Sequence, residues 1–492
     1  MSHGSSLTEL RARHGERYRW LLLLSVMVGT MASIMSSTII NVAIPDMSHY
    51  FALGQARAQW VSSGFMVAMT VAMLTTPWLL ASFGYRHTYM GTMVLLLAGG
   101  IVGGLSNDFG IVLAARVAEG LAAGAVQPIP AIIIMRAFQP SEQGRASGIF
   151  GMGVVLAPAV GPSIGGILVE LFGWRSIFFM VVPFCVASIW LAQRFVPVSA
   201  PGGAAPDRRS TRLDWQGLVL ATVGTLCLLN GLVELHGGAH ALSAVLLVGA
   251  FATLAGFVAW QRHQTHHGLS PLMDLKLFHH KPFAMGSLVA IIYGTALFGS
   301  TYLLPLYIKT AQGLSAAHVG TILLPAGIVL AITIPLAGRL ADTQPTRVLV
   351  SIGLVLLAAS FALMVTVPMH AAIWVLVLWS VLGRIGLGFI LPSLNSGAMR
   401  GLPPALISQG SSSINFLRML GGATGVSLCG IILEWRLSAH HDNLANAETS
   451  LGRLSAFNET FVLLAVVCAL ALLAAWQMRT PPRGAAAKAA PH

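Results

Sequence analysis

Long apolar runs alternate with short polar segments along the whole of this 492-residue sequence. An α-helix needs about 20 mostly apolar residues to cross the hydrocarbon core of a bilayer, because each residue adds about 1.5 Å. Measured by that length, the sequence contains fourteen candidate spans. They cover residues 19–44, 57–80, 87–106, 108–137, 147–171, 175–197, 214–236, 240–261, 282–309, 316–339, 346–367, 371–399, 406–434 and 457–479. The pattern predicts an all-α integral membrane protein with fourteen transmembrane helices.

Composition agrees with that prediction, because 55% of the residues are hydrophobic and only 9% are charged. A soluble domain usually carries about 25% charged residues, so a soluble protein is excluded. The formal charge of +12 could suggest a nucleic-acid partner. The basic residues, however, are scattered between apolar runs instead of forming one patch, so we expect no nucleic acid as a partner.

The distribution of basic residues predicts the orientation, since Lys and Arg gather in cytoplasmic loops. With fourteen spans, both termini lie on the same side of the membrane. Most of the 28 Lys and Arg residues fall on that side, and those on the opposite side are Arg57, Arg175, Lys309, Arg436 and Arg453. Both termini are therefore expected in the cytoplasm, with the chain in the cytoplasmic (inner) membrane.

The chain also looks doubled. Arg116 and Gly120 in the fourth span are echoed by Arg384 and Gly388 in the twelfth. Two pseudosymmetric six-helix bundles result if the seventh and eighth spans are an inserted pair. The predicted parts are a cytoplasmic N-terminus at 1–18, an N-terminal bundle at 19–197, a linker at 198–213, the inserted pair at 214–261, a cytoplasmic loop at 262–281, a C-terminal bundle at 282–479 and a tail at 480–492. Internal repeats around a midplane site are typical of secondary transporters.

The fifth span is unusually rich in glycine and proline. Its candidate functional residues are Gly153, Pro158, Gly161, Pro162, Gly165 and Gly166. Proline removes a backbone donor and weakens a helix, whereas glycine lets a neighbouring helix approach closely. The segment could therefore bend and slide, or it could simply be a well-packed helix.

Several motifs, read in order, resemble a known family. The fifth span resembles the antiporter motif of the major facilitator superfamily, and the segment from Leu113 to Gly124 resembles that superfamily's fourth-helix motif. The segments from Ser37 to Pro45, Pro271 to Phe278 and Tyr302 to Tyr307 are similar to its fourteen-helix drug:proton antiporter branch, the EmrB/QacA type. The resemblance implies two bundles that rock about a central cavity, with proton entry driving export.

The sequence departs from that family pattern in two places. An acidic residue usually precedes the Ser/Thr pair of the first helix, and here Ser36 occupies that position. The loop after the second helix keeps only the Gly and a displaced Arg of its motif, whereas the second-half copy is better preserved. The residues expected in these cytoplasmic gate loops are Gly84, Arg86, Gly338, Arg339 and Asp342.

Glu119 is the carboxylate that lies well inside a predicted span, and it follows Arg116 by three residues. Residues at that spacing share a helix face, so the two side chains can pair. An ionisable residue inside a membrane is costly and marks a candidate functional site. We predict that Glu119 and Arg116 couple proton movement to transport; the alternative is a static ion pair that holds the bundle together.

Polar side chains deep in the spans are the candidates for a substrate cavity. They are Ser36, Asn41, Gln127, Asn230, Tyr293, Tyr302, Asn395, Asn415 and Arg418. The histidines between His263 and His280 lack an ordered ligand spacing, so we expect no metal. No catalytic residues are expected either, because the sequence has no nucleophile elbow and no phosphate-binding glycine loop.

The sequence and the resemblance together predict a proton-coupled multidrug exporter of amphipathic or lipophilic molecules. A dedicated exporter of one lipid or metabolite stays open, and so does a non-transporting sensor or scaffold built on the same fold. No cofactor is expected, since the proton gradient would supply the energy. The expected partners are protons, the transported molecule and the lipid bilayer, and the resemblance also allows a periplasmic adaptor protein.

Overall fold

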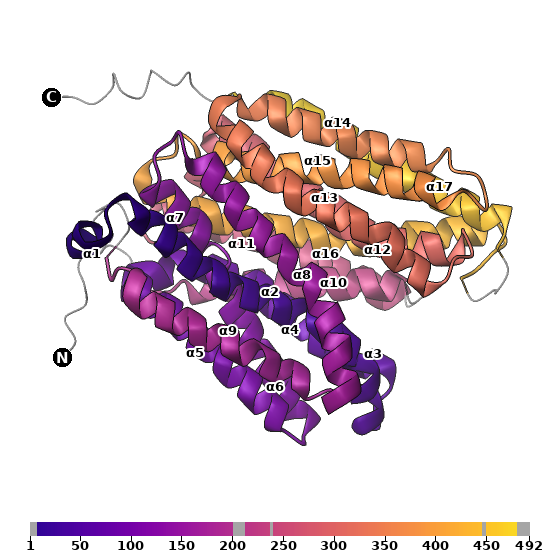
Figure 1. The fold of residues 1–492 in the computed structure, drawn as a ribbon, viewed down its shortest axis with the longest axis horizontal. Coiled ribbons are helices and arrows are strands. Elements are labelled where there is room, and N and C mark those ends of the chain that lie inside the picture. Colours follow the sequence, from indigo (N-terminus) through magenta and orange to yellow (C-terminus); the bar gives the residue numbers. More distant parts are fainter. Residues whose placement is uncertain (1–6, 200–211, 237–239, 445–448, 480–492) are drawn as a thin grey trace. The chain divides into compact units, whose positions relative to one another are not determined.

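The computed structural model describes residues 7–199, 212–236, 240–444 and 449–479, and within these ranges every regular element is a helix (Figure 1). The α-helices are α1 (Leu7–His14), α2 (Tyr18–Tyr50), α3 (Gln55–Ala58), α4 (Trp60–Ala72), α5 (Thr76–Leu105), α6 (Phe109–Val126), α7 (Ile129–Ala137), α8 (Gln143–Phe172), α9 (Ser176–Phe195), α10 (Trp215–His236), α11 (His240–His266), α12 (Lys281–Thr310), α13 (Ala316–Thr343), α14 (Thr346–Met364), α15 (Ile373–Met399), α16 (Ile407–Ala439) and α17 (Leu451–Trp476). Four short 3₁₀ helices are η1 (Gly15–Arg17), η2 (Met73–Thr75), η3 (Leu275–His279) and η4 (Pro404–Leu406). Most of the predicted linker 198–213 and the predicted tail 480–492 lie outside the described residues.

The membrane prediction is supported by helix length and by the nature of the exposed side chains. Twelve helical segments of the described chain are long and apolar enough to cross a bilayer. Large apolar side chains stand exposed on them, among them Phe251, Leu324 and Leu473, which are 78%, 65% and 67% exposed. Such side chains are stable only against lipid, because water would penalise that much apolar surface. The chain is a multi-pass membrane protein.

The count of twelve differs from the fourteen spans that the sequence predicts. Nearly all of the second and third predicted spans fall within one stretch, Trp60–Leu105, of 46 residues. Gly84 interrupts this stretch with a φ of 75° and a ψ of 174°, values that are not helical. The fifth predicted span, 147–171, falls in α8, where residues 158–160, 162 and 163 have side chains outside the described set. The structure therefore shows an all-helical membrane fold with twelve candidate spans, and it does not show fourteen.

The chain divides into two compact units. Unit 1 comprises Met1–Thr225, Leu254–Leu275 and Pro404–Phe416, and unit 2 comprises Leu226–Thr253, Lys276–Pro403 and Leu417–His492. The bundle boundaries predicted from the sequence stay a prediction.

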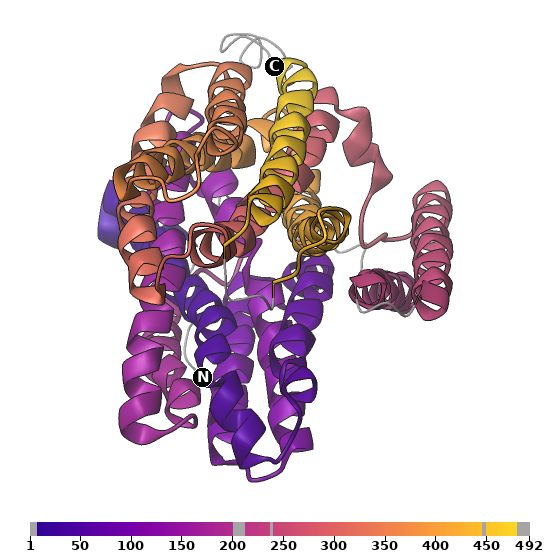
Figure 2. The same cartoon turned by 90° about the vertical axis from the view of Figure 1, so that its right-hand side faces the viewer.

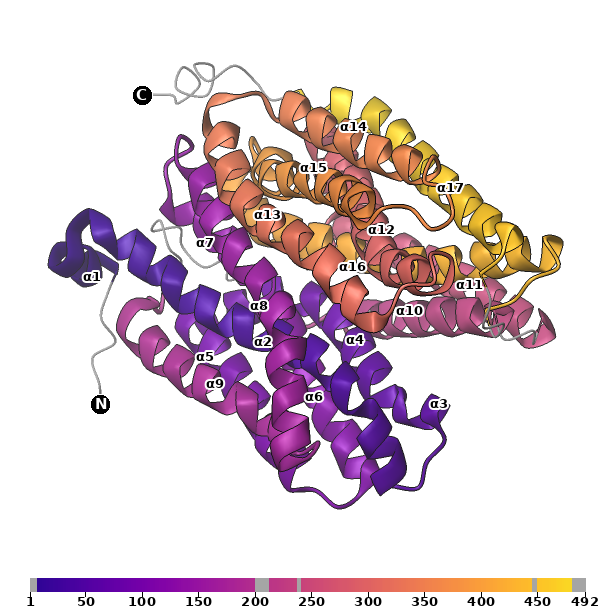
Figure 3. The same ribbon diagram turned by 45° about the vertical axis from the view of Figure 1, so that its right-hand side comes forward.

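Within unit 1, α6 packs against α4 and α5, while α2 packs against α8 and α9, and α5 also contacts α9 (Figures 1 and 3). Buried side chains such as Leu22, Val26, Tyr89, Ile133 and Cys185 form the hydrophobic core of this unit. The polar groups of α2, α4 and α6 described below meet inside this arrangement.

Within unit 2, α15 packs against α13 and α14, while α12 and α14 both contact α17 (Figure 2 gives a second view of these helices). In unit 2, α15 packs against the two α-helices that precede it, as α6 packs against α4 and α5 in unit 1. Gly353 of α14 and Gly386 of α15 lie so close that a Cβ on either would come within 2.7 Å of the other's carbonyl oxygen. Contacts between small residues replace the hydrophobic driving force that is absent between helices in lipid.

Candidate functional site

A buried ion pair lies on α6. Nη1 of Arg116 is 2.5 Å from Oε2 of Glu119, and the two side chains are only 2% and 1% exposed. Three residues separate them, so the helix itself places both on one face. The sequence predicted this pairing from the same spacing.

The Arg116 guanidinium also contacts two other helices. It donates from Nη1 to the hydroxyl of Ser36 at 2.8 Å and from Nη2 to the Ser36 carbonyl at 3.1 Å. Its Nε donates to the carbonyl of Val61 at 3.4 Å, and its Cζ lies 4.3 Å from the centre of the Phe65 ring. Arg116 therefore joins α6 to α2 through Ser36 and to α4 through Val61 and Phe65.

The two oxygens of Glu119 have different surroundings. Oε2 accepts from Arg116 and also from the Ser36 hydroxyl at 3.3 Å. Oε1 is buried and has no hydrogen-bond donor among the described residues. Glycines of α5 border it, since a Cβ on Gly99 would lie 2.5 Å from Cγ of Glu119 and one on Gly100 would lie 3.5 Å from Oε1. The site can thus accept a proton on Oε1 while Oε2 keeps its bonds.

Close helix packing brings the ion pair to α4. A Cβ on Gly120 would lie 2.4 Å from the carbonyl oxygen of Phe65, and one on Gly124 would lie 2.1 Å from that of Met69. Any larger residue would push α6 away from α4, since close approach requires small residues. The two glycines therefore set the distance at which Arg116 reaches Val61 and Phe65.

The glycines of the fifth predicted span lie on α8 and face α2, the helix that carries Ser36. A Cβ on Gly153 would lie 2.7 Å from Sδ of Met27, and one on Gly165 would lie 2.4 Å from Cγ1 of Ile39. Gly161 and Gly166 are less crowded, with nearest contacts at 3.2 Å and 4.0 Å. Pro158 and Pro162 have side chains outside the described set. The α8 backbone thus lies directly against α2.

The residues predicted in cytoplasmic gate loops lie within helices α5 and α13 instead of in loops, and their role in gating stays a prediction. In unit 1, Arg86 donates from Nε to the carbonyl of Val196 at 2.7 Å, and a Cβ on Gly84 would lie 2.6 Å from the carbonyl oxygen of Val198. These contacts hold the bend after the first part of α5 to the end of α9. In unit 2, Gly338, Arg339 and Asp342 lie in the last turns of α13, with Asp342 buried.

The substrate-cavity candidates are divided between the two units. Asn41, Gln127 and Asn415 belong to unit 1, and Asn230, Tyr293, Tyr302, Asn395 and Arg418 belong to unit 2. Asn230 and Asn415 donate to carbonyls four residues earlier in their own helices, at 2.8 Å and 2.9 Å. Tyr293 is buried, and it lies near enough to Arg384 and Arg418 to interact with both electrostatically. Ser36 is 1% exposed and is bound to the ion pair instead of lining a pocket.

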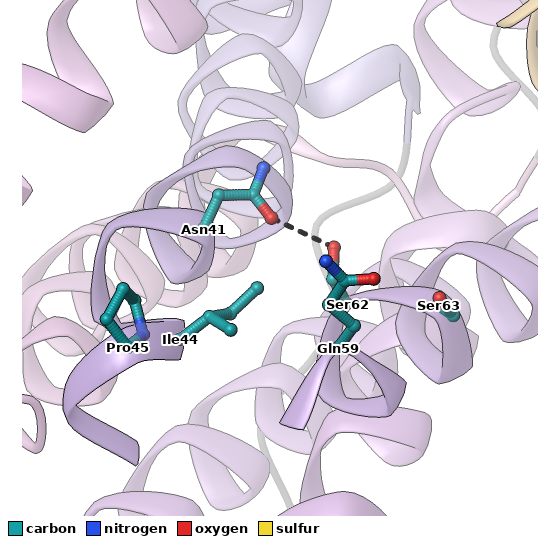
Figure 4. A pocket seen from close by; sticks show the side chains of 6 residues that line it. All are labelled: Asn41, Ile44, Pro45, Gln59, Ser62 and Ser63. Atoms are coloured by element: carbon teal, nitrogen blue, oxygen red, sulfur yellow. Dashed lines mark hydrogen bonds between the residues drawn. The ribbon is translucent and has the colours of Figure 1, made fainter. Parts of the chain in front are cut away.

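A pocket of 360 Å³ opens in unit 1, where α2 nears its end and α4 begins (Figure 4). It is lined by Asn41, Ile44, Pro45, Gln59, Ser62 and Ser63. Across it, the hydroxyl of Ser62 donates to Oδ1 of Asn41 at 3.0 Å. Asn41 is the one predicted cavity residue among the six.

Sequence reasoning missed the polar residues at the start of α4. Gln59, Ser62 and Ser63 lie near the start of the predicted span 57–80, and nothing in the local sequence marks them as cavity residues. It also missed Phe65 and Val61 as partners of Arg116, because contacts between helices leave no trace in local spacing.

The chain is similar in sequence and in fold to known membrane transporters. The sequence profile of the Major Facilitator Superfamily matches residues 26–426. The chain is 27% identical to the multidrug resistance protein B homolog of Mycobacterium tuberculosis, over 87% of this chain and 79% of the relative. It is 24% identical to the riboflavin transporter RibZ of Clostridioides difficile, over 93% of this chain and 97% of the relative. The fold is similar to that of the human organic anion transporter MFSD10, with a TM-score of 0.64 at 15% identity, over 93% of this chain and 99% of the other.

Proposed function

Because the chain belongs to the major facilitator superfamily, whose members are membrane transporters, we propose that it is a proton-coupled exporter of amphipathic small molecules. The observation that carries this proposal is the buried cluster of Ser36, Arg116 and Glu119. Burial of a charged pair in a membrane protein is costly, so it is retained where it has a function. The M. tuberculosis relative is named a multidrug resistance protein, which supports export of foreign compounds.

The proposed coupling step is protonation of Glu119 on Oε1. Protonation neutralises the carboxylate and removes most of its attraction to Arg116, which keeps its bonds to Ser36 and Val61. The junction of α2, α4 and α6 is then held by fewer charges and can favour a second arrangement of the helices. A membrane potential supplies about 2.3 kcal/mol per charge per 100 mV, enough to shift a two-state equilibrium more than tenfold.

We include fourteen spans in the proposal, with both termini in the cytoplasm. The stretch Trp60–Leu105 has 46 residues and would be about 69 Å long as one straight helix, more than twice the bilayer core of about 30 Å. It therefore suits two spans that meet near Gly84, where the backbone leaves the helical region. Helix α8, with 30 residues, would be the other additional span. The distribution of Lys and Arg between the loops supports the orientation.

A second candidate is a carrier dedicated to one metabolite. The relative from C. difficile is named a riboflavin transporter, and Ser36 leaves the first helix without the acid that the antiporter branch usually has there. The two candidates differ in substrate breadth. A non-transporting sensor predicts no flux of any compound.

The test uses protein reconstituted into liposomes with an inward-directed pH gradient. Proton release is followed while lipophilic cations, neutral drugs, riboflavin and lipids are added in turn. Wild type is compared with Glu119→Gln and with Glu170→Gln, which changes an exposed carboxylate on α8. We expect several compounds to drive proton flux in wild type and in Glu170→Gln and none in Glu119→Gln. Response to a single compound would favour the dedicated carrier, and response to none, in folded protein, would contradict transport.

A further inference from the structure

The pocket between α2 and the start of α4 has the size and the chemistry of a ligand site. Its volume of about 360 Å³ lies within the usual range of about 300–1,000 Å³ for small-molecule sites. Four of its six lining side chains can form hydrogen bonds, and Ile44 and Pro45 add an apolar wall. We infer that this pocket binds an uncharged, hydrogen-bonding group of the transported molecule, such as a sugar-like polyol or an amide.

The lining side chains keep hydrogen-bonding capacity for a ligand. The hydroxyl of Ser62 donates to Oδ1 of Asn41. The amide nitrogen of Asn41 points away from this bond, so its two N–H groups can donate to a ligand (Figure 4). Gln59 and Ser63 are exposed, so their amide and hydroxyl groups are accessible from the pocket. A ligand therefore meets both donors and acceptors, as a polyol or an amide requires.

Pro45 adds an acceptor at the same place. In a regular helix the N–H of residue 45 would donate to the carbonyl of residue 41, but proline has no N–H. Because Pro45 lies inside α2, the backbone carbonyl of Asn41 lacks its usual helical donor. A hydroxyl or amide N–H of a ligand at this turn can satisfy that carbonyl.

Charge decides which class of ligand fits. None of the six lining residues is charged. A cation here would find no carboxylate in the lining, and an anion would find no guanidinium or ammonium. Moving an unpaired charge out of water is far more costly than moving a hydroxyl that keeps its hydrogen bonds. An uncharged polar group is therefore favoured over a charged one of either sign.

The identification of this ligand as transported molecule rests on the proposed function, but its chemistry can be tested separately. The probes share one naphthyl body and differ in the attached group: naphthyl β-glucoside, naphthyl trimethylammonium and naphthalene sulfonate. Equilibrium binding to protein in lipid nanodiscs is measured without any gradient. We expect the glucoside to bind wild type about tenfold more tightly than either charged probe.

Two variants test the lining residues. Asn41→Leu and Gln59→Leu each remove hydrogen-bonding groups, and Gln59 makes no side-chain cap to α4, so its loss leaves the helix intact. Each should weaken glucoside binding about fivefold, the effect of one lost hydrogen bond. Thr301→Val, which removes an exposed hydroxyl on α12, is the control and should change nothing.

Two results would overturn the inference: equal binding of all three probes by wild type, or glucoside binding that neither variant weakens. Failure of the proposed function gives a different result. A protein that binds the glucoside through Asn41 and Gln59 but shows no proton flux would contradict proton-coupled transport and leave the binding pocket supported. Glu170→Gln should bind the glucoside as wild type does, because Glu170 is exposed on α8 and does not line the pocket.

Discussion

Ser36 presents two oxygen atoms to the guanidinium of Arg116, its hydroxyl at 2.8 Å from Nη1 and its backbone carbonyl at 3.1 Å from Nη2. Both are neutral acceptors, so α2 binds Arg116 without contributing a charge. The carboxylate that pairs with Arg116 comes instead from Glu119 on α6 itself. A carboxylate at position 36 would therefore meet the same guanidinium from the opposite helix.

This geometry predicts that a carboxylate at position 36 on α2 can replace the carboxylate of Glu119 on α6. Glu119→Gln should abolish substrate-driven proton flux, and adding Ser36→Asp should restore at least about a tenth of it, because the new carboxylate also lies against Arg116. The measurement is proton release from liposomes under a pH gradient. Ser37→Asp with Glu119→Gln is the control, since the Ser37 hydroxyl donates to its own helix at Ile34. Equal rescue by both aspartates would show that position 36 is not special.

The glycines of α6 should be intolerant of even one added carbon. Gly120→Ala puts a methyl group 2.4 Å from the Phe65 carbonyl oxygen, a backbone atom that cannot move aside alone. We expect a loss of about 1–3 kcal/mol in unfolding free energy, the usual cost of overpacking. Gly91→Ala on α5 is the control, because nothing lies within 4 Å of its Cβ position. Thermal unfolding in detergent should separate the two, and similar melting temperatures would contradict tight packing of α6 on α4.

The ion pair shows how far local sequence patterns reach. Spacing within one helix predicted that Arg116 and Glu119 would pair, and apolar run length predicted which parts of the chain would be helical spans. Ser36 was noticed as a missing acid, but its contact with Arg116 depends on how α2 packs against α6, which periodicity does not encode. The pocket residues Gln59 and Ser62 were missed for the same reason, since they become a site only when α4 begins beside Asn41. The structure gives twelve candidate spans where the sequence predicts fourteen, because Trp60–Leu105 counts as one stretch despite the break at Gly84 and α8 is not among the twelve.

Two ion pairs near the connection from α16 to α17 should differ in their contribution to stability. Arg453 pairs with Asp442 where both side chains are buried, 2% and 7% exposed, and it also donates to the carbonyls of Thr310 and Asn443. Arg436 and Glu459 pair where the side chains are 44% and 38% exposed. Water and salt screen the exposed pair, whereas removing one partner of a buried pair leaves an uncompensated charge.

Alanine double-mutant cycles measure this difference. Asp442→Ala should lower the unfolding free energy by about 3–5 kcal/mol and couple strongly to Arg453→Ala. The cycle of Arg436→Ala with Glu459→Ala should show a coupling near zero that falls further with added salt. The comparison fails if the exposed pair couples as strongly as the buried one.

The unequal surroundings of the two Glu119 oxygens separate proton coupling from a static ion pair. Oε2 is bound by Arg116 and Ser36, while Oε1 is buried with no donor in the described part of the chain, so a proton has one defined place to bind. If Glu119 couples transport, it must gain and lose that proton in the working pH range; a static pair stays charged throughout. Infrared difference spectra between acidic and alkaline samples report this directly, through the stretching band of a protonated carboxyl group. We expect a band that shifts in heavy water, is absent in Glu119→Gln and persists in Glu170→Gln. A wild-type spectrum without a Glu119 band, in protein that still transports, would assign Arg116 and Glu119 to holding the helices together and would move the coupling proton elsewhere.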